Sequence, residues 1–168
     1  PAYVSDVATL AHHRGLKVHV DGARLFNAAA ALSVEAEALV TDVDSVTFCL
    51  SKGLSAPVGS LICGDSVFIE EVHRARKVLG GGMRQAGIIA AAGIVALEKM
   101  TTRLGEDHRR ARQLAEGFAE LPDVSVGPVY TNIFYFTLAQ TCPMDGAALA
   151  AAMKSRGILM PNRGPRTF

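Results

Sequence analysis

Helical spacings and short apolar runs alternate along the first part of the chain. Apolar residues recur at helical spacing in 4–14 and 24–32. Apolar runs at 16–20 and 45–50 predict buried strands, and a shorter strand is predicted at 60–63. Helix and strand in alternation are typical of an α/β domain with a parallel sheet, so we expect the later part of such a domain.

Three more helices are expected after these strands. Residues 65–78 have one apolar and one charged face, and the glycines at 80–82 end this segment. Residues 85–100 are small and apolar almost throughout, so we expect this helix to be buried nearly all round. Residues 104–121 carry more charge and predict a surface helix between two domains.

The last part of the chain changes to the alternation that is typical of strands. Strands are predicted at 124–126, 133–138 and 158–160. A helix is predicted at 145–156, with Asp145 as its N-cap. These elements predict a small α+β module.

The elements divide the 168 residues into a large domain, a connecting helix and a smaller domain. We expect the later part of the large α/β domain over 1–100, an interdomain helix over 101–122, and an incomplete α+β domain over 123–168. A hydrophobic content of 49% and a charged content of 20% are typical of a globular chain.

Charge and cysteine content exclude several classes of protein. A net charge of +1 produces no overall field that would favour nucleic acid, and no apolar stretch is long enough to predict a membrane span. We also expect no signal peptide. Cys49, Cys63 and Cys142 lack the paired spacing of a zinc site. We therefore expect no metal, and core thiols in a reducing, cytoplasmic setting.

Two predicted strand ends carry the candidate chemistry. One strand leads into Asp21 and the next into Lys52, and open α/β sheets bind ligands at that edge. An ion pair is the simplest explanation, Lys52 is alternatively an ordinary surface lysine, and Asp21 is also suited to capping the next helix. A lysine in a crevice can instead act as an amine toward an aldehyde. Pyridoxal phosphate enzymes need such a lysine for the cofactor aldehyde and a carboxylate against the pyridine nitrogen, and Lys52 and Asp21 fit these two roles.

Three motifs, in order along the chain, carry a resemblance to a known family. They are HVDGARLFNA at 19–28, SKGLSAPVGS at 51–60 and LGGGMRQ at 79–85. Together they resemble the low-specificity L-threonine aldolases, in the β-eliminating lyase group of fold-type I pyridoxal phosphate enzymes. The resemblance implies the later part of a large domain of the PLP-dependent transferase type, followed by a small α+β domain. Members of that family are considerably longer, so we expect a piece of such a chain.

The resemblance implies roles for the motif residues at the cofactor. Lys52 would be the catalytic residue that forms the Schiff base, Asp21 would bind the pyridine nitrogen, and Ser51 would contact the cofactor beside them. The family usually has glycine where this chain has Ser55, which changes the lysine loop without removing chemistry.

The glycine run at 80–82 is either a simple turn between helices or a phosphate site. Open backbone amides beside a helix N-terminus receive a phosphate well. By resemblance, Arg84 would bind cofactor phosphate across a subunit interface. The protein would then be a homo-oligomer, a dimer or tetramer with shared active sites.

Three arginines are candidates for binding the substrate carboxylate. Arg24 follows Asp21 by three residues, and its planar guanidinium suits a carboxylate, although a structural salt bridge is an alternative. Arg163 and Arg166 lie near where the family places another such arginine. His19 points to the same side of the strand as Asp21, and we expect a core histidine with satisfied hydrogen bonds.

The activity that the resemblance implies is retro-aldol cleavage of L-threonine or L-allo-threonine to glycine and acetaldehyde. The partner would be a small β-hydroxy-α-amino acid, with no nucleic acid and no membrane. Two alternatives stay open: a pyridoxal phosphate lyase that eliminates a β-substituent from another amino acid, and a catalytically incomplete fragment.

Overall fold

The computed structural model describes residues 2–168, and the chain divides into two compact units. The first unit extends to Gly105, and the second comprises Glu106–Phe168. The predicted three-part division, with limits after residues 100 and 122, stays a prediction.

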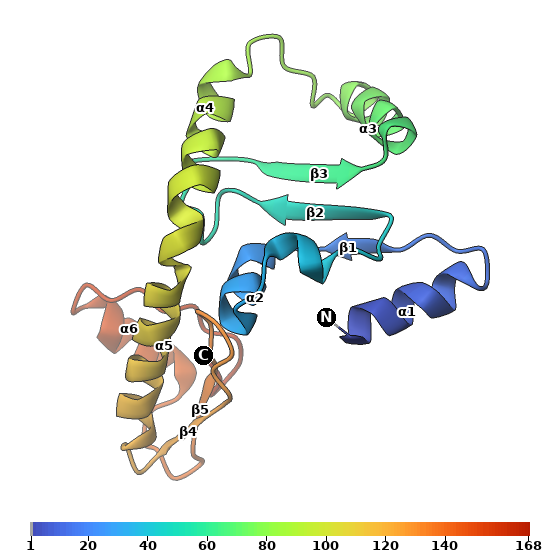
Figure 1. The fold of residues 1–168 in the computed structure, drawn as a ribbon. Coiled ribbons are helices and arrows are strands. Elements are labelled where there is room, and N and C mark those ends of the chain that lie inside the picture. Colours follow the sequence, from blue (N-terminus) through green and yellow to red (C-terminus); the bar gives the residue numbers. More distant parts are fainter. Residues whose placement is uncertain (1) are drawn as a thin grey trace. The chain divides into compact units, whose positions relative to one another are not determined.

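A three-stranded sheet forms the centre of the first unit (Figure 1). Its strands are β1 (His19–Asp21), β2 (Ser45–Cys49) and β3 (Ser60–Gly64), and β2 lies between the other two. Branched and aromatic side chains favour extended backbone because they fit a pleated surface. The three predicted strands are confirmed, although β1 is shorter than predicted and starts later. The prediction that this strand is buried is wrong, because His19 and Asp21 are exposed and only Val20 is half-buried.

The two neighbours of β2 run in opposite directions. β1 is parallel to β2, with Asp21 opposite Thr47, whereas β3 is antiparallel to β2. The prediction of a parallel sheet is therefore wrong for β3. The connection explains the difference, because residues 50–59 contain no helix and a parallel crossover needs about a dozen residues or more.

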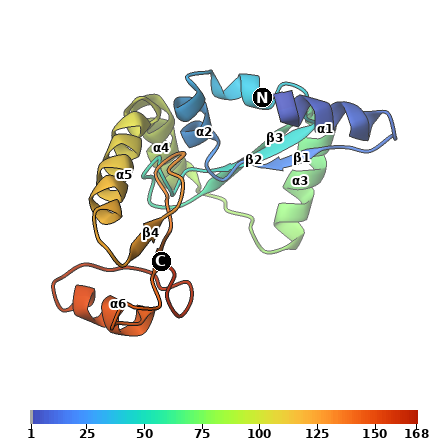
Figure 2. The same ribbon diagram turned by 90° about the horizontal axis from the view of Figure 1, so that it is seen from below.

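Helices flank this sheet, with α1 and α2 on one side and α3 on the other (Figure 2). Their bounds are α1 (Ala2–His12), α2 (Leu25–Leu32), the short 3₁₀ helix η1 (Ala36–Leu39) and α3 (Ser66–Val78). The helices predicted at the positions of α1, α2 and α3 are confirmed. α3 starts where the carboxylate of Asp65 accepts a hydrogen bond from the amide of Phe68 at 2.9 Å.

The core of the first unit lies between β2 and α2. Val46 and Phe48 of β2 belong to one buried cluster with Leu25 and Ala29 of α2. Phe48 also meets Phe26 edge to face, with 5.2 Å between the ring centroids. Such a pair adds about 0.5–1.5 kcal/mol to the burial of the rings. These contacts fix α2 on the sheet directly after β1.

Helical residues continue from Gly87 to Ala119. In order, the elements are α4 (Gly87–Val95), a π-helical turn η2 (Ala96–Met100), a 3₁₀ turn η3 (Thr101–Arg103) and α5 (Leu104–Ala119). The prediction that 85–100 is buried nearly all round is wrong, because Ile88 is 86% exposed and Gly93 is the buried residue of α4. Gly93 lies against Leu50, and the core of the first unit includes Ala96 of the following turn but no side chain of α4. The apolar side chains of α4 therefore stay largely uncovered.

The second unit contains most of α5, a two-stranded sheet and a last helix. Its further elements are β4 (Val124–Val126), the antiparallel β5 (Phe136–Leu138) and α6 (Gly146–Lys154). Its buried core consists of Phe136, Leu138, Cys142 and Phe168. Asp145 caps α6 as predicted, because its carboxylate accepts a hydrogen bond from the amide of Ala148 at 2.8 Å.

The predicted strand at 158–160 is wrong. Thr167 instead forms a bridge to Thr137 of β5, and Phe136 and Phe168 exchange two backbone hydrogen bonds at 3.1 and 3.0 Å. These bonds occupy the edge of β5 that a strand over 158–160 would need.

The three cysteines differ in exposure. Cys142 is buried, Cys49 is half-buried and Cys63 is exposed, so the prediction of core thiols is wrong for Cys63. Cys63 lies on β3, an edge strand whose side chains are mostly exposed. Within residues 2–168, no helix is long and apolar enough to cross a bilayer, and no three potential metal ligands cluster.

Candidate functional site

Asp21 ends β1 at the C-terminal edge of the strand. Its carboxylate is exposed, and its Oδ1 accepts a hydrogen bond from the amide of Ala23 at 3.2 Å. This bond turns the chain toward α2 but does not cap that helix, because the N-cap position is Arg24. The alternative of Asp21 as the N-cap is therefore wrong.

Lys52 and the preceding Ser51 follow β2 in a short loop. Leu50 closes this loop, since its amide donates to the carbonyl of Gly59 and its carbonyl accepts from the amide of Ala56, each at 3.0 Å. Ser51 and Lys52 themselves are exposed. The loop therefore displays the amine instead of burying it.

Asp21 and Lys52 follow neighbouring parallel strands, so both lie beyond strand ends at the same edge of the sheet. Within residues 2–168, neither forms an ion pair, and neither does Arg24. An Asp21–Lys52 ion pair and a structural Arg24 salt bridge are therefore wrong, whereas the exposure of Lys52 leaves the alternative of an ordinary surface lysine open. A carboxylate, an amine and a guanidinium are thus available to a bound molecule.

An open pocket of about 510 Å³ adjoins β1 and the start of α2. Asp21 and Arg24 both line it, among apolar side chains from α1 and α2. Lys52 and Ser51 do not belong to its lining. The structure therefore brings the acid and one candidate carboxylate-binding arginine together, whereas Lys52 follows the neighbouring strand and lies outside the lining of this pocket.

His19 joins β1 to β2 through its side chain. Its Nδ1 lies 2.9 Å from Oγ of Ser45, and its Nε2 lies 3.1 Å from Oγ1 of Thr47. The prediction of satisfied hydrogen bonds is confirmed. The prediction of a core position is wrong, because His19 is exposed on the sheet face that it shares with Asp21.

Asp44 is a structural residue that sequence reasoning missed. It accepts hydrogen bonds from Nζ of Lys17 and the amide of Val18, each at 2.7 Å, and contacts Nε2 of His12 at 2.8 Å. The hydrogen bond from Lys17, followed by those from Val18 and His12, holds the pKa of Asp44 well below its usual range, and the same contact raises the pKa of Lys17. Asp44 thus ties the end of α1 and the start of β1 to the start of β2.

The glycine run ends α3 in a Schellman motif. The amide of Gly81 donates to the carbonyl of Arg76 at 2.8 Å, and that of Gly80 donates to the carbonyl of Lys77 at 3.2 Å. Gly80 has a φ of 83°, which suits glycine. The prediction of open amides is therefore wrong for Gly80 and Gly81, because both amides satisfy the last carbonyls of the helix.

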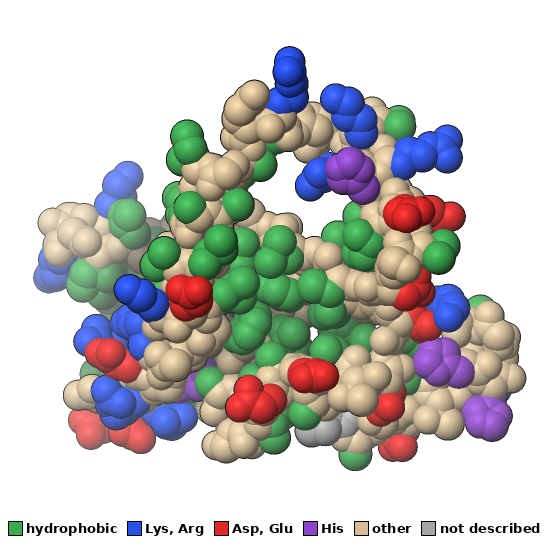
Figure 3. Space-filling view, turned by 45° about the horizontal axis from the view of Figure 1, so that its top comes forward, with side chains coloured by type: hydrophobic (Ala, Val, Ile, Leu, Met, Phe, Trp, Pro, Cys, Tyr) green, Lys and Arg blue, Asp and Glu red, His purple; other side chains and the backbone are tan. Residues whose placement is uncertain are grey.

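Arg84 lies in a basic pocket of about 310 Å³ that the glycine turn creates. The pocket is lined by His73, Arg76, Lys77, Gly82, Met83 and Arg84, and no acid belongs to it. Figure 3 shows basic side chains gathered around α3 and the loop that follows it. Three cations without an acid favour a bound anion, which agrees with a phosphate role for Arg84 but does not test it.

Arg163 and Arg166 belong to the second unit. Nη1 of Arg166 donates to the carbonyls of Ala139, Cys142 and Met144 at 2.7, 3.2 and 3.3 Å. These contacts give Arg166 a structural role in holding one loop. Arg163 is exposed. Binding of a substrate carboxylate by either arginine stays a prediction.

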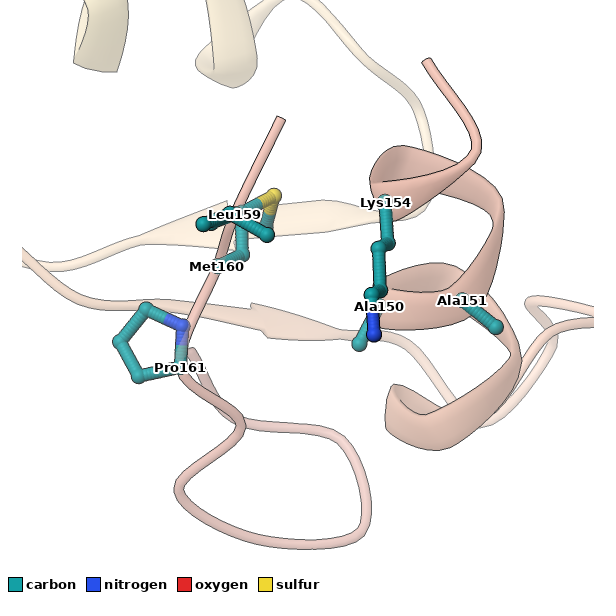
Figure 4. Close-up of a pocket in the computed structure, with 6 residues that line it drawn as sticks. All are labelled: Ala150, Ala151, Lys154, Leu159, Met160 and Pro161. Carbon is teal, nitrogen blue, oxygen red and sulfur yellow. The ribbon is translucent and has the colours of Figure 1, made fainter. Parts of the chain in front are cut away.

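An open pocket of about 350 Å³ in the second unit lies between α6 and the segment that follows it (Figure 4). It is lined by Ala150, Ala151, Lys154, Leu159, Met160 and Pro161. Its lining is mostly aliphatic, with Lys154 as the charged residue. Neither predicted arginine of this unit lines it.

Comparisons with known proteins agree with the motifs. The beta-eliminating lyase family matches residues 1–141. Low-specificity L-threonine aldolase 1 from Arabidopsis thaliana is 44% identical over 160 residues, which are 94% of this chain and 45% of that protein. The low specificity L-threonine aldolase of Escherichia coli K12 is 42% identical over 158 residues, 94% of this chain and 46% of that protein. The chain thus spans less than half the length of these curated relatives.

Solved structures agree on the fold. A Listeria monocytogenes EGD-E chain assigned as an L-allo-threonine aldolase has a TM-score of 0.82 at 21% identity, over 99% of this chain and 49% of that one. A methionine gamma lyase from Micromonospora echinospora has a TM-score of 0.64 at 18% identity, and the match covers 98% of this chain and 53% of that one. At these identities the likeness shows the fold alone, and it confirms the predicted fold-type I α/β class. With its three motifs and the match over residues 1–141, the chain belongs to the beta-eliminating lyase family.

Proposed function

We propose that the protein is a pyridoxal phosphate-dependent lyase that cleaves L-threonine and L-allo-threonine to glycine and acetaldehyde. One observation carries this proposal: Asp21 and Lys52 follow neighbouring parallel strands at one edge of the sheet, and neither forms an ion pair with any residue that the structure describes. The identity of 42–44% to low-specificity L-threonine aldolases supports the substrate class.

The residues at this edge fit pyridoxal phosphate. Its pyridine nitrogen needs an acid, and the exposed carboxylate of Asp21 has that chemistry. Its aldehyde needs a primary amine, which the loop displays at Lys52, with Ser51 beside it. When bound, the cofactor supplies an electron sink for the bond that is broken at the substrate α-carbon. Arg84 would hold its phosphate from the neighbouring subunit.

Arg24 would bind and orient the substrate. Its guanidinium can donate two parallel hydrogen bonds to the α-carboxylate, which restricts rotation of the substrate. Because Arg24 lines the same pocket as Asp21, the carboxylate would be held close to the acid. Cleavage then requires that the β-hydroxyl loses its proton as the Cα–Cβ bond breaks, and that the α-carbon of glycine gains one.

We also propose a homo-oligomer in the cytoplasm. The role of Arg84 at a neighbouring site requires a second subunit, and the uncovered apolar side chains of α4 support burial against further protein. Three free cysteines support a reducing compartment.

The test adds pyridoxal phosphate to the complete protein that contains this sequence and records the visible spectrum. An absorption band of the lysine-bound cofactor is expected in the unaltered protein and not in Lys52→Ala, with Lys99→Ala as a control that keeps it. Product analysis with L-threonine follows. Glycine and acetaldehyde support the proposal, whereas ammonia and a keto acid indicate β-elimination. A missing band in the complete protein contradicts the cofactor role, and the same spectrum of the 168-residue chain tests the fragment alternative.

A further inference from the structure

A buried amide on α2 meets the loop that carries Lys52. Asn27 is 3% exposed, although the rest of its helix consists of Leu, Phe and Ala. Burial of a carboxamide costs free energy unless its polar atoms find partners. Its place in so apolar a helix therefore needs a physical reason, and its carboxamide faces the chain at Gly53.

Gly53, the residue after Lys52, leaves space for this amide. A β-carbon at Gly53 would lie 2.9 Å from Oδ1 and 3.5 Å from Nδ2 of Asn27, and 3.1 Å from Cδ2 of Leu104. Leu104 is fully buried and has no room to move away. Asn27 and Leu104 therefore pack closely against the lysine loop at Gly53.

This packing supports the Lys52 loop in addition to the backbone bonds that Leu50 and Ser55 form within it. The side chain of Lys52 is exposed, and glycine accepts many backbone conformations, so the neighbouring peptide has little preference of its own. Asn27 is in turn joined to Arg24, whose carbonyl accepts its amide hydrogen at 3.0 Å. One turn of α2 thus reaches both Arg24 and the loop of Lys52.

We propose that Asn27 is a positioning residue, whose buried carboxamide holds the loop at Gly53 and thereby sets the direction of Lys52 relative to Asp21 and Arg24. This role rests on the proposed function, because it concerns the amine that would bind the cofactor aldehyde. Asn27 acts through Gly53 and does not itself meet the reacting atoms.

The test uses the complete protein with Asn27→Ala, Gly53→Ala or both changes. Ala29→Gly is the control, because Ala29 is also buried on α2 and this change weakens the helix without altering the amide. Each protein is incubated with pyridoxal phosphate, reduced with borohydride and digested. Mass spectrometry then gives the labelled fraction of Lys52 relative to Lys154, and melting temperatures are recorded without cofactor.

Asn27→Ala is expected to lower labelling of Lys52 by about 10-fold to 100-fold, since an ångström-scale misplacement of a reacting group produces a loss of this order. Ala29→Gly is expected to be labelled at Lys52 as fully as the unaltered protein, although its melting temperature is lowered to a value similar to that of Asn27→Ala. Gly53→Ala is expected to lower both quantities. In the double variant the added methyl occupies the space that the amide leaves, so the melting temperature recovers while labelling stays low.

Three results would overturn the positioning role. They are unchanged labelling in Asn27→Ala, an equal loss in Ala29→Gly, and recovered labelling in the double variant, because each shows that the amide contributes packing alone. Absence of label at Lys52 in the unaltered protein would defeat the proposed function itself, and the positioning role with it.

Discussion

The backbone amide of Ser55 donates to the carbonyl of Lys52 at 2.9 Å, and Ser55 forms this bond from a left-handed conformation with a φ of 61°. A residue with a β-carbon is disfavoured there by about 1–2 kcal/mol. By resemblance, related aldolases usually have glycine at this position. The lysine loop of this chain therefore contains a strained residue three positions after Lys52.

Ser55→Gly is expected to raise the free energy of unfolding by about 0.5–1 kcal/mol. Relief of the left-handed strain exceeds the additional entropy that glycine loses on folding, which is about 0.5–1 kcal/mol. Denaturant unfolding measures the difference. Ser51→Gly is the matched control, because Ser51 has no left-handed backbone to relieve, and a decrease in stability is expected. A lower stability for Ser55→Gly would contradict the assigned strain.

Gly22→Ala is expected to lower the free energy of unfolding by about 1–3 kcal/mol, the usual range for an overpacked site. The amide of Gly22 donates to the carbonyl of Thr47 at 2.7 Å, and an added β-carbon would lie 3.0 Å from that oxygen. The methyl group must therefore displace β1 from β2 directly after Asp21. Denaturant unfolding measures the loss.

The control for that change is Gly105→Ala. Nothing lies within 4 Å of a β-carbon at Gly105, which is helical, so alanine is expected to stabilise it by up to about 1 kcal/mol. A Gly22→Ala protein as stable as this control would show that the close approach of Gly22 and Thr47 is not required.

The strand ends that carry Asp21 and Lys52 could be predicted because their signals are local. An apolar run followed by a polar residue and glycine specifies a strand and its end within a few residues. The cap of α6 by Asp145 is equally local. The motif resemblance then supplied the family, which matches residues 1–141.

The missed role of Asp44 and several failed predictions depend on contacts between distant residues. Nothing near Asp44 in the sequence indicates that Lys17 and His12 will meet its carboxylate. The apolar composition of α4 does not indicate whether its side chains pack against the rest of this unit, and Ile88 is exposed. The prediction of open amides failed for a local reason, because the amide of Gly81 donates a hydrogen bond to the end of α3 and is not left open for a phosphate.

Arg24→Lys is expected to raise the KM for L-threonine by about 10-fold or more in the complete protein, with a smaller effect on kcat. Lysine keeps the charge but loses the second of two parallel hydrogen bonds, and one bond to a charged group is worth about 1.5–3 kcal/mol. Steady-state kinetics measure the change. Arg14→Lys, an exposed arginine after α1, is expected to leave KM unchanged. An unchanged KM in Arg24→Lys would contradict carboxylate binding.

Asp44→Asn is expected to lower the melting temperature at pH 7, and the gap to the unaltered protein is expected to narrow in acid. Because the hydrogen bond from Lys17, with those from Val18 and His12, lowers the pKa of Asp44 in the folded chain, the unfolded chain binds the proton more readily. The stabilisation is therefore complete above the ordinary carboxyl pKa of about 4 and is lost as pH falls toward the folded value. Thermal unfolding from pH 7 to about pH 2 measures this difference in melting temperature. Asp6 is exposed on α1, so the control Asp6→Asn is expected to melt at the same temperature as the unaltered protein. A gap that stays constant in acid would mean that the charge of Asp44 does not stabilise the fold.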